Sequence, residues 1–299
     1  MVAGHTHDLY TTPHRAGDKL IVQAGSYGRH LGRLDLEFDA GQLRLLNPGR
    51  TIIRIDDKVV ADAEMLSRIA VYKAALDAML APLGYRYASV VTQAERDMPQ
   101  GLEANNPLGV FVTSRIEAEL KRRLAEPPDV YFTELSLIRE DWLTVQGRST
   151  PLQMSDLFRL LPVGFGPAFT PGSPIVGFYV TAQELSGLME VIELQRLLGR
   201  RGALVYSDTL SYRVRSWGIP FVNRVADLQL HGKPLSQAPP LIHVATTAYV
   251  AAFIPRLGQL THGLASVQMK DRQGRPISEP QALAAPPEAF LFADSFKPH

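Results

Sequence analysis

Apolar residues recur with helical spacing in two long segments of the chain. Between residues 62 and 80 they lie three and four positions apart, which predicts an amphipathic helix that ends before Pro82 and Gly84. Between residues 104 and 124 they follow an i+4 ridge, and we expect this ridge to face the core. The first set comprises Met65, Ile69, Tyr72, Leu76 and Met79, and the second comprises Leu108, Val112, Ile116, Leu120 and Leu124.

Two polar segments have the form of helix caps. Thr150–Gln153 reads as a capping box with proline at the first helical position, which predicts a short helix to Leu161. Residues 181–184 form a second capping box, which predicts a helix with Gly199 at its C-terminal cap. Both signals place helices in the second half of the chain.

Short apolar and β-branched runs between turn residues predict β-strands. They lie in the segments 20–38 (a strand, a loop and a second strand), 42–46, 51–55, 86–93, 130–137, 175–180, 210–215, 224–230 and 241–246. The Ala/Pro-rich segment 280–288 predicts an irregular tail. Strand runs and separate helices together predict an α+β fold, and we find no internal repeat.

The composition narrows the classes of function. With 299 residues, of which 45% are hydrophobic, the chain can bury a sizeable core and is expected to form one large domain plus a smaller piece. A net charge of +1 gives no electrostatic reason to bind nucleic acid or an acidic membrane surface, so we expect neither partner. The lack of cysteine excludes disulfides and thiol chemistry. No apolar run reaches the ~20 residues that span a bilayer and no leader peptide is evident, which leaves a periplasmic and a cytoplasmic location open.

A His-x-His pair lies close to the N-terminus, in the run Gly4-His5-Thr6-His7-Asp8. Two imidazoles on one loop can face one ion or two adjacent ions, and Zn, Mn, Fe and Co accept such nitrogen ligands. A catalytic site needs at least three protein ligands around each ion, so the pair alone is also compatible with a solvated loop. The other histidines are scattered singly and are expected to be surface or core residues: His14, His30, His231, His243, His262 and His299.

The segment that follows the His-x-His pair carries a family resemblance. Residues 20–38 read LIVQAGSYGRHLGRLDLEF, with Gly25, Gly28 and Gly32 expected at bends. With the Gly-His-Thr-His loop, this segment resembles the end of the metal domain of calcineurin-like metallophosphoesterases, and most of all the 5'-nucleotidase branch. The resemblance implies that His5 and His7 bind a dinuclear centre of Mn, Zn, Fe or Co, with Asp8 beside the ligands.

The earlier motifs of that family do not occur in this sequence. They are an Asp-x-His, a Gly-Asp and a Gly-Asn-His-Glu/Asp segment, which carry most of the metal ligands and the catalytic His/Asp pair. We therefore expect this chain to be the C-terminal part of a longer enzyme, with a metallophosphatase half as its missing partner. On this view residues 1–57 close the metallophosphoesterase β-sandwich, and a helix within 58–84 connects them to residues 85–299 and packs its apolar stripe against one or both domains.

Residues 85–299 are similar to the 5'-nucleotidase C-terminal domain. The matching motifs occur in the family's order: Asn106-Pro107-Leu108-Gly109, Ile138-Arg139, residues 155–162, residues 181–190, Leu210-Ser211-Tyr212 and residues 230–235. The resemblance implies a domain that holds a nucleoside between two aromatic rings while an arginine contacts polar or anionic groups. Arg139 would be that arginine, with Phe165 and Phe253 as candidate rings.

The expected pocket departs from the family pattern. Valine occupies the position of the first ring, at Val163, and the usual Gly-Gly-Asp-Gly loop after the second ring is absent. Glu134 brings a carboxylate close to Arg139 in the sequence. A solvated turn for Arg139, and core positions for the two phenylalanines, are the other readings of these residues.

Two functions remain open from the sequence. The first is a metal-dependent phosphoester hydrolase of the 5'-nucleotidase family, acting on a nucleotide or a related small phosphate ester and incomplete in this chain. The second is a non-catalytic module, derived from the 5'-nucleotidase C-terminal domain, which binds a small molecule or another protein. Metal binding by the chain would favour the first.

Overall fold

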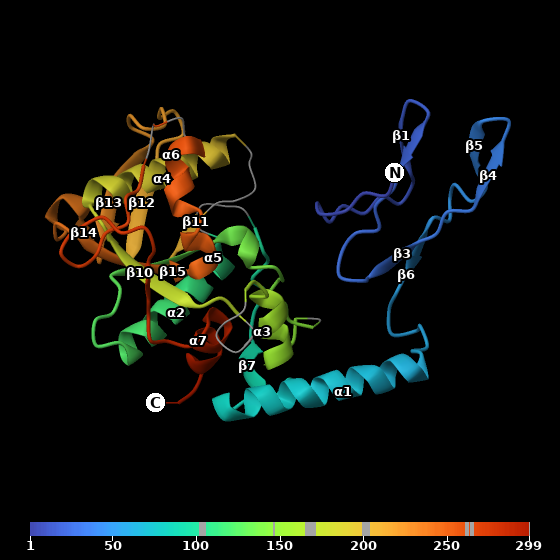
Figure 1. The fold of residues 1–299 in the computed structure, drawn as a ribbon, viewed down its shortest axis with the longest axis horizontal. Helices are drawn as coiled ribbons and strands as arrows, with labels where there is room; N and C mark the ends of the chain where they lie inside the picture. Colours follow the sequence, from blue (N-terminus) through green and yellow to red (C-terminus); the bar gives the residue numbers. More distant parts are fainter. Residues whose placement is uncertain are drawn as a thin grey trace. The chain divides into compact units, whose positions relative to one another are not determined.

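The computed structural model describes residues 1–101, 106–145, 147–164, 172–198, 204–260, 263 and 266–298. The chain divides into two compact units, which are Met1–Lys73 and Ala74–His299 (Figure 1). The boundary between them lies within the helix that the apolar stripe predicts.

Unit 1 (Met1–Lys73) is built from two-stranded antiparallel ladders. β1 (His14–Ala16) pairs with β2 (Lys19–Ile21), β3 (His30–Gly32) with β6 (Ile52–Arg54), and β4 (Leu36–Asp39) with β5 (Gln42–Leu45). β4, β5 and β6 confirm predicted strands to within one or two residues at each end. β1 lies outside the predicted strands, and β3 lies in the part of segment 20–38 that is predicted as a loop. Gly25 and Gly28 have positive φ at bends, as predicted, whereas Gly32 lies at the end of β3.

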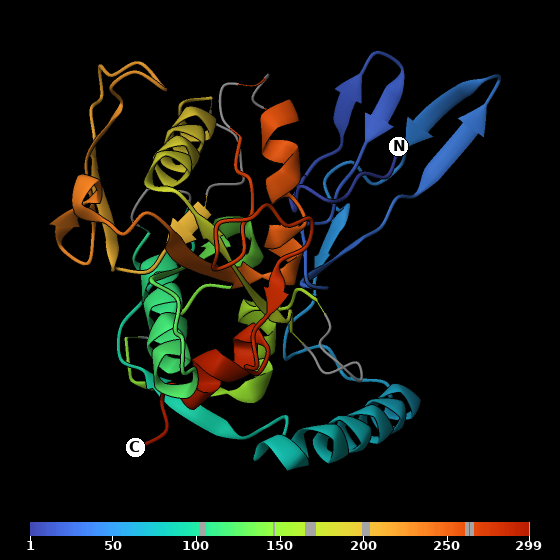
Figure 2. The ribbon, with the colours of Figure 1, turned by 60° about the vertical axis from the view of Figure 1, so that its left-hand side comes forward.

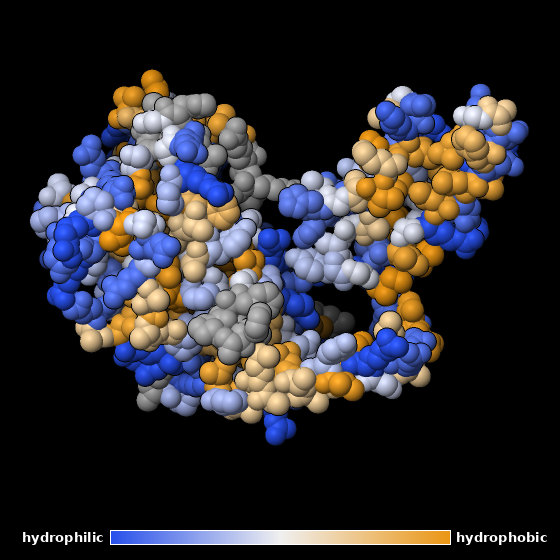
Figure 3. Space-filling view, in the orientation of Figure 1, coloured by the Kyte–Doolittle hydropathy of each residue, from blue (hydrophilic) through white to orange (hydrophobic). Residues whose placement is uncertain are grey.

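Unit 1 buries very little of its own surface. Among its described residues only Leu20, Gln23 and Thr51 are buried. Hydrophobic residues instead lie on its surface, including Leu31, Leu36 and Phe38 (Figure 3). Two-stranded ladders without a hydrophobic core are marginal in water, so this unit needs further apolar surface to pack against.

Helix α1 (Ala63–Leu80) confirms the first predicted helix. The side chain of Asp62 accepts a hydrogen bond from the backbone N–H of Met65 at its start (2.9 Å). The turn η1 (Ala81–Leu83) follows and ends at Gly84 in a left-handed conformation. Of the stripe, Leu76 packs against a core cluster of unit 2, whereas Met65, Ile69, Tyr72 and Met79 are exposed.

Unit 2 (Ala74–His299) is organised around a five-stranded sheet. The strand order is β11 (Leu204–Tyr206), β8 (Val130–Glu134), β15 (Ile242–Thr247), β10 (Ile175–Val180) and β16 (Gln281–Ala282). β8 and β15 are parallel, with Val244 opposite Val130, and the other pairs are antiparallel. The carboxyl ends of β8 and β15 therefore lie at the same edge of the sheet, where β10 begins.

Helices cover both faces of this sheet (Figures 1 and 2). Because side chains alternate along a strand, Tyr131 and Phe132 of β8 point to opposite faces. Tyr131 belongs to the core formed with α2 (Pro107–Arg123), α3 (Met154–Leu160) and α7 (Glu288–Asp294). Phe132 belongs to the core formed with α4 (Ala182–Leu197) and α5 (Ala248–Ala251). The predicted ridge on α2 is buried, with Leu108, Val112, Ile116 and Leu120 fully inside.

Smaller elements complete unit 2. They are the ladder of β7 (Val90–Ala94) with β9 (Thr150–Gln153), the sheet of β12 (Leu210–Val214), β13 (Val225–Leu230) and β14 (Lys233–Pro234), α6 (Leu257–Leu260), and the 3-10 turns η2 (Leu135–Leu137), η4 (Leu235–Gln237) and η5 (Ile254–Arg256). No helix in the described ranges combines the length and apolarity that crossing a bilayer requires. Helices and sheets are thus mixed in this unit.

Three predictions about local structure are wrong in whole or in part. Thr150–Gln153 is strand β9, and the helix starts only at Met154, where Gln153 and Asp156 form the capping box. Segment 280–288 is largely irregular, as predicted, but it is not a tail, because Gln281–Ala282 join the main sheet as β16 and the segment leads into the buried helix α7. The strand predicted for 130–137 ends at Glu134, where η2 begins. The expected cap Gly199 lies outside the described residues.

Candidate functional site

The loop that carries the His-x-His pair has an unusual backbone. His5 and His7 both have left-handed conformations, with φ of +71° and +64°. Residues other than glycine rarely adopt this conformation, and it persists only where the surroundings impose it. The N–H of Thr6, which lies between them, donates to the carbonyl of Gly4 (2.9 Å). The loop therefore has a defined shape although both imidazoles are exposed.

The side chain of Gln23 anchors this loop through hydrogen bonds. Its side chain is buried, and with the amide oxygen turned towards the loop it accepts hydrogen bonds from the N–H groups of His7 (3.0 Å) and Asp8 (2.7 Å) and from the Thr6 hydroxyl (2.9 Å). The N–H of Gly25 donates to the carbonyl of Asp8 (3.0 Å). One buried side chain thus anchors three consecutive residues of the loop.

The turn after Gly25 supplies the neighbours of the histidines. The ring of Tyr27 meets the His7 ring edge to face, with ring centroids 5.4 Å apart. The guanidinium of Arg29 lies 5.5 Å from the Tyr27 ring centroid. The Asp8 carboxylate lies 2.6 Å from the Thr6 hydroxyl oxygen. Sequence reasoning did not single out Tyr27 or Arg29, although both belong to the Ser-Tyr-Gly-Arg run that carries the resemblance.

The donor atoms on this loop do not make a complete metal site. In the described parts of the chain no group of three or more His, Asp or Glu side chains is placed to hold one ion. His14, which lies in the same unit, stacks on Tyr10 at 4.1 Å. His5 and His7 therefore supply two nitrogen donors, which is fewer than a catalytic ion requires.

Arg139 lies near the carboxyl end of β8, at the sheet edge described above. It is half-buried, and its backbone N–H donates to the carbonyl of Leu160 at the end of α3 (2.8 Å). Glu134, the last residue of β8, accepts a hydrogen bond from the Ser136 hydroxyl. The turn between Glu134 and Arg139 is therefore stabilised by one hydrogen bond within the turn and by one to α3.

An aromatic pair lies beyond the carboxyl end of β15. The rings of Tyr249 and Phe253 are 5.4 Å apart, and both side chains are exposed. The guanidinium of Arg256 lies 5.8 Å from the Phe253 ring, and the N–H of Tyr249 contacts the Ser173 hydroxyl (3.4 Å). Tyr249 is not among the candidate rings named from the sequence. Its position two residues after the end of β15 could have indicated one. The other candidate ring, Phe165, lies outside the described residues.

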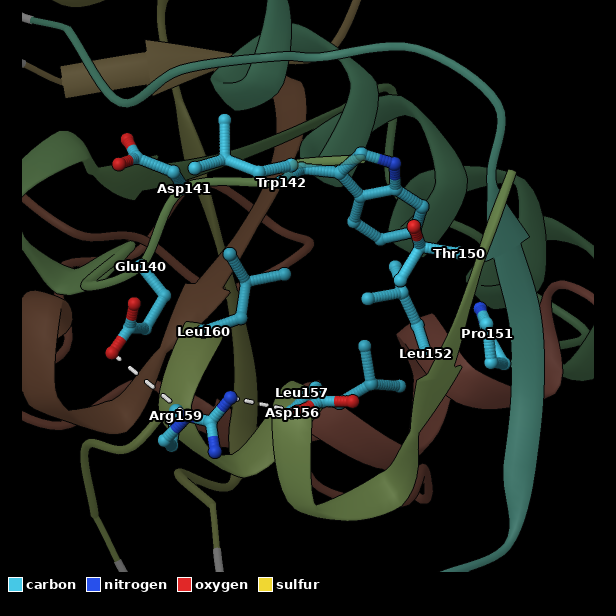
Figure 4. Close-up of a pocket in the computed structure, with 11 residues that line it drawn as sticks. Glu140, Asp141, Trp142, Thr150, Pro151, Leu152, Asp156, Leu157, Arg159 and Leu160 are labelled. Carbon is cyan, nitrogen blue, oxygen red and sulfur yellow. Dashed lines mark hydrogen bonds and ion pairs between the residues drawn. The ribbon is translucent and has the colours of Figure 1, made fainter. Parts of the chain in front are cut away.

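A pocket of about 330 Å³ opens between β9, α3 and the segment that follows η2 (Figure 4). Arg159 in its wall lies 2.7 Å from Asp156 and 3.8 Å from Glu140. Asp156 also accepts a hydrogen bond from the N–H of Gln153 at the start of α3 (2.7 Å). Three carboxylates, with Asp141 as the third, outnumber the single guanidinium in the wall. This pocket therefore does not suit a phosphate group.

Glu288, at the start of α7, is a buried acid that sequence reasoning assigned to a tail. Burial raises its pKa from 4.5 to about 7, against the opposing effect of hydrogen bonds from Tyr131 and Thr133. Its backbone N–H donates to the carbonyl of Ser173 (3.2 Å), and Ser173 also contacts Tyr249. Glu288 is enclosed by protein, so it can affect the aromatic pair only indirectly.

Comparison with solved structures identifies the fold. The chain is similar to the 5'-nucleotidase precursor of Thermus thermophilus, with a TM-score of 0.57 and 17% identity over 93% of this chain and 48% of that one. It is also similar to a protein of Staphylococcus aureus, named as a candidate 5'-nucleotidase and solved in complex with alpha-ketoglutarate, with a TM-score of 0.53 and 14% identity. That match covers 98% of this chain and 52% of that one. The chain has a 5'-nucleotidase fold. It spans about half the length of each structure.

Comparison of sequences adds another relative. The chain is 22% identical to the Endonuclease YhcR of Bacillus subtilis (strain 168) in an alignment of 208 residues, which covers 62% of this chain and 15% of that protein. No family model matches the chain. The resemblance to 5'-nucleotidases is confirmed at the level of the fold, while the assignment of a C-terminal domain and a β-sandwich stays a prediction.

Proposed function

We propose that this chain is part of a phosphoester hydrolase with a 5'-nucleotidase fold, acting on a nucleotide or a related small phosphate ester. The observation that carries the proposal is the loop of His5 and His7. The buried side chain of Gln23 binds three consecutive residues of this loop and so fixes the position of the two histidines. The fold and the relatives support the same class of chemistry.

In this proposal His5 and His7 hold a divalent ion of Mn, Zn, Fe or Co through their imidazole nitrogens, with Asp8 beside them. When bound, such an ion would polarise the phosphate ester and lower the pKa of a bound water. The remaining ligands would come from a metallophosphatase half outside these residues. The exposed apolar side chains of unit 1, such as Phe38 and Leu36, support a partner that packs against its strands.

Unit 2 would hold the organic part of the substrate. Exposed aromatic rings such as Tyr249 and Phe253 offer flat faces on which a nucleobase can stack. Arg139 would contact a polar or anionic group, because a guanidinium matches phosphate and carboxylate oxygens. Phe165 lies outside the described residues, so this proposal takes Tyr249 as the second ring, beside Phe253.

A metal titration with matched variants tests the role of the loop. The purified chain is titrated with Mn²⁺ and Zn²⁺ while the histidine side-chain resonances are followed, and bound metal is counted after dialysis. We expect metal binding that shifts His5 and His7, is lost in His5→Ala/His7→Ala and is kept in His14→Ala. Equal binding by all three proteins would contradict the ligand assignment.

An activity assay tests the chemistry. Turnover of p-nitrophenyl phosphate and AMP is measured with each metal, for the wild-type chain and the same variants. Turnover that depends on His5 and His7 would support hydrolysis and would mean that further ligands complete the site. The absence of both metal binding and turnover would mean that the chemistry needs residues outside this chain. A fusion of this chain to a metallophosphatase half that still bound no metal and cleaved no phosphate ester would contradict hydrolysis and favour the non-catalytic module.

A further inference from the structure

The loop between β12 and β13 exposes a cluster of large apolar side chains. Residues 215–224 form this loop, called here the Trp217 tip. Trp217, Ile219 and Val222 are 72%, 62% and 72% exposed. Figure 2 shows the hairpin, in amber at the upper left, extending away from the sheet of unit 2. An apolar cluster at the end of a projecting hairpin is costly in water and indicates a binding role.

Buried side chains hold the Trp217 tip in one shape. The carboxylate of Glu190, buried on α4, accepts hydrogen bonds from the backbone N–H groups of Phe221 (2.9 Å) and Val225 (3.0 Å). Across the base of the tip, the N–H of Arg215 donates to the carbonyl of Arg224 (2.9 Å). The carboxylate therefore fixes the returning half of the loop to the body of the unit.

The backbone of the tip is equally constrained. The N–H of Ile219 donates to the side-chain oxygen of Asn223 (2.9 Å), which closes the turn. A Cβ at Gly218 would lie 2.6 Å from the Cα of Arg224, so only glycine fits there. Phe221 has a left-handed backbone with φ of +63°. A loop held in this way presents its apolar side chains with little loss of entropy on binding.

A cation lies beside the apolar cluster of the tip. Residues 215–224 contain Arg215 and Arg224 and no acidic residue. The side chain of Arg224 is only 11% exposed and lies 3.9 Å from the buried carboxylate of Glu193, so its charge is paired inside the unit. The guanidinium of Arg215 is partly exposed and lies 5.7 Å from the ring of Trp217. The tip is therefore apolar at its centre, with one positive charge at its edge.

We propose that the Trp217 tip inserts into the interfacial layer of a membrane that contains anionic lipids. Tryptophan prefers this layer, where its ring is half in hydrocarbon and half hydrated. Ile219 and Val222 would enter the apolar side, while the stem of Arg215 lies along it and its charged end reaches a lipid phosphate. The tip lies at the end of the two-stranded hairpin of β12 and β13 (Figure 2), which suits insertion more than a broad protein interface does. This binding would attach the chain to a membrane surface without a spanning helix.

Tryptophan fluorescence gives a direct test, because the chain has two tryptophans and the other, Trp142, is only 4% exposed. The full chain is mixed with phosphatidylcholine vesicles, with and without phosphatidylglycerol, and with vesicles of brominated lipid. We expect a blue shift and quenching by brominated lipid that need phosphatidylglycerol and are absent in Trp217→Phe. Circular dichroism confirms that each variant is folded.

Co-sedimentation measures the strength of binding. The double variant Ile219→Ser/Val222→Ser should lower the partition coefficient at least about tenfold, because both substitutions remove apolar side-chain area that would be buried in the membrane. Arg215→Gln should weaken binding only to anionic vesicles. Phe38→Ser, which removes an equally exposed apolar side chain from unit 1 (74% exposed), should change nothing.

Two outcomes would overturn the proposal. Failure of the wild-type chain to bind anionic vesicles, or equal loss of binding in Phe38→Ser, would show that the tip is not a membrane site. A blue shift of Trp217 that appears without lipid as protein concentration rises, together with dimers in sedimentation velocity, would assign the tip to contact with a second copy.

Discussion

The hydroxyl of Tyr131 donates a hydrogen bond of 2.7 Å to the carboxylate of Glu288, and both side chains are buried. The two residues lie 157 positions apart, on β8 and at the start of α7. Burial is the largest cause that raises the pKa of Glu288 to about 7. The attachment of α7 to the sheet therefore depends on an acid that is close to ionising at neutral pH.

This acid makes the stability of unit 2 depend on pH. The pKa of Glu288 is raised in the folded state, so between about pH 4.5 and pH 7 the unfolded chain ionises while the folded chain stays protonated. The free energy of unfolding should therefore fall as pH rises through this window, by about 3 kcal/mol in total. Glu288→Gln, which cannot ionise, should lose this dependence and gain relative stability at the upper end of the window.

Urea unfolding at about pH 5 and about pH 8 measures the effect. Glu279→Gln is the matched control, because Glu279 is exposed and its replacement should leave the slope with pH unchanged. An identical pH slope in the wild type and in Glu288→Gln would show that Glu288 is ionised in the folded protein.

Gly109→Ala should destabilise unit 2 although alanine is the better helix former. A Cβ at Gly109 would lie 2.8 Å from Val205 Cγ2 and 2.9 Å from Leu135 Cδ1, and both neighbours are buried. We expect a net loss of about 1–2 kcal/mol, because the overpacking outweighs the gain of about 1 kcal/mol in helix propensity. Thermal unfolding checks this, with Gly49→Ala as the control, since a Cβ there meets open space. Equal stability of Gly109→Ala and the wild type would mean that α2 can move away from the sheet.

Elements with strong local signals could be predicted from the sequence. β10 has the predicted bounds, and α4 starts at the predicted capping box of Thr181 and Glu184. Thr150–Gln153 carried a similar signal but became a strand, because it pairs with β7 and the cap moved to Gln153. A short capping motif indicates only a local preference to start a helix, and pairing with a strand distant in the sequence can override that preference.

The parts of the candidate site that depend on distant contacts could not be predicted. Helix α7 is buried on every side and has no polar face, so it lacks the periodicity that identifies a surface helix. The pairing of Glu288 with Tyr131 has no local signal at all. His5, His7 and Arg139 were singled out because each belongs to a short motif. Gln23 lies in the run 20–38, but nothing in the sequence indicates that its side chain contacts the His-x-His loop.

Gln23→Ala should release the His-x-His loop. It removes one acceptor shared by the N–H groups of His7 and Asp8 and by the Thr6 hydroxyl. Because water can replace part of this bonding in an exposed loop, we expect a cost of about 1–2 kcal/mol. Amide chemical shifts of His7 and Asp8 should move towards random-coil values, and affinity for Mn²⁺ or Zn²⁺ should fall by a similar free energy.

Two further variants separate the role of Gln23 from a general effect of mutation. Gln23→Glu keeps oxygen acceptors at the same place and should retain the loop, whereas the exposed Gln42→Ala should change neither shifts nor affinity. A Gln23→Ala protein with unchanged shifts at His7 would mean that the left-handed backbone is held by other contacts.

Tyr249→Ala and Phe253→Ala should weaken substrate binding without loss of stability. Both rings are exposed and lie 5.4 Å apart, so each should offer a stacking face while contributing little to the core. We expect each change to raise the dissociation constant for AMP roughly tenfold, since a stacked base contributes about 1–3 kcal/mol. The free energy of unfolding should stay within about 0.5 kcal/mol of the wild type. Isothermal titration calorimetry measures the dissociation constant for AMP. Tyr249→Phe should retain affinity because it keeps the ring. Tyr72→Ala, at another exposed tyrosine, is the control. Unchanged AMP binding in the Tyr249→Ala/Phe253→Ala double variant would show that the aromatic pair is not a stacking site.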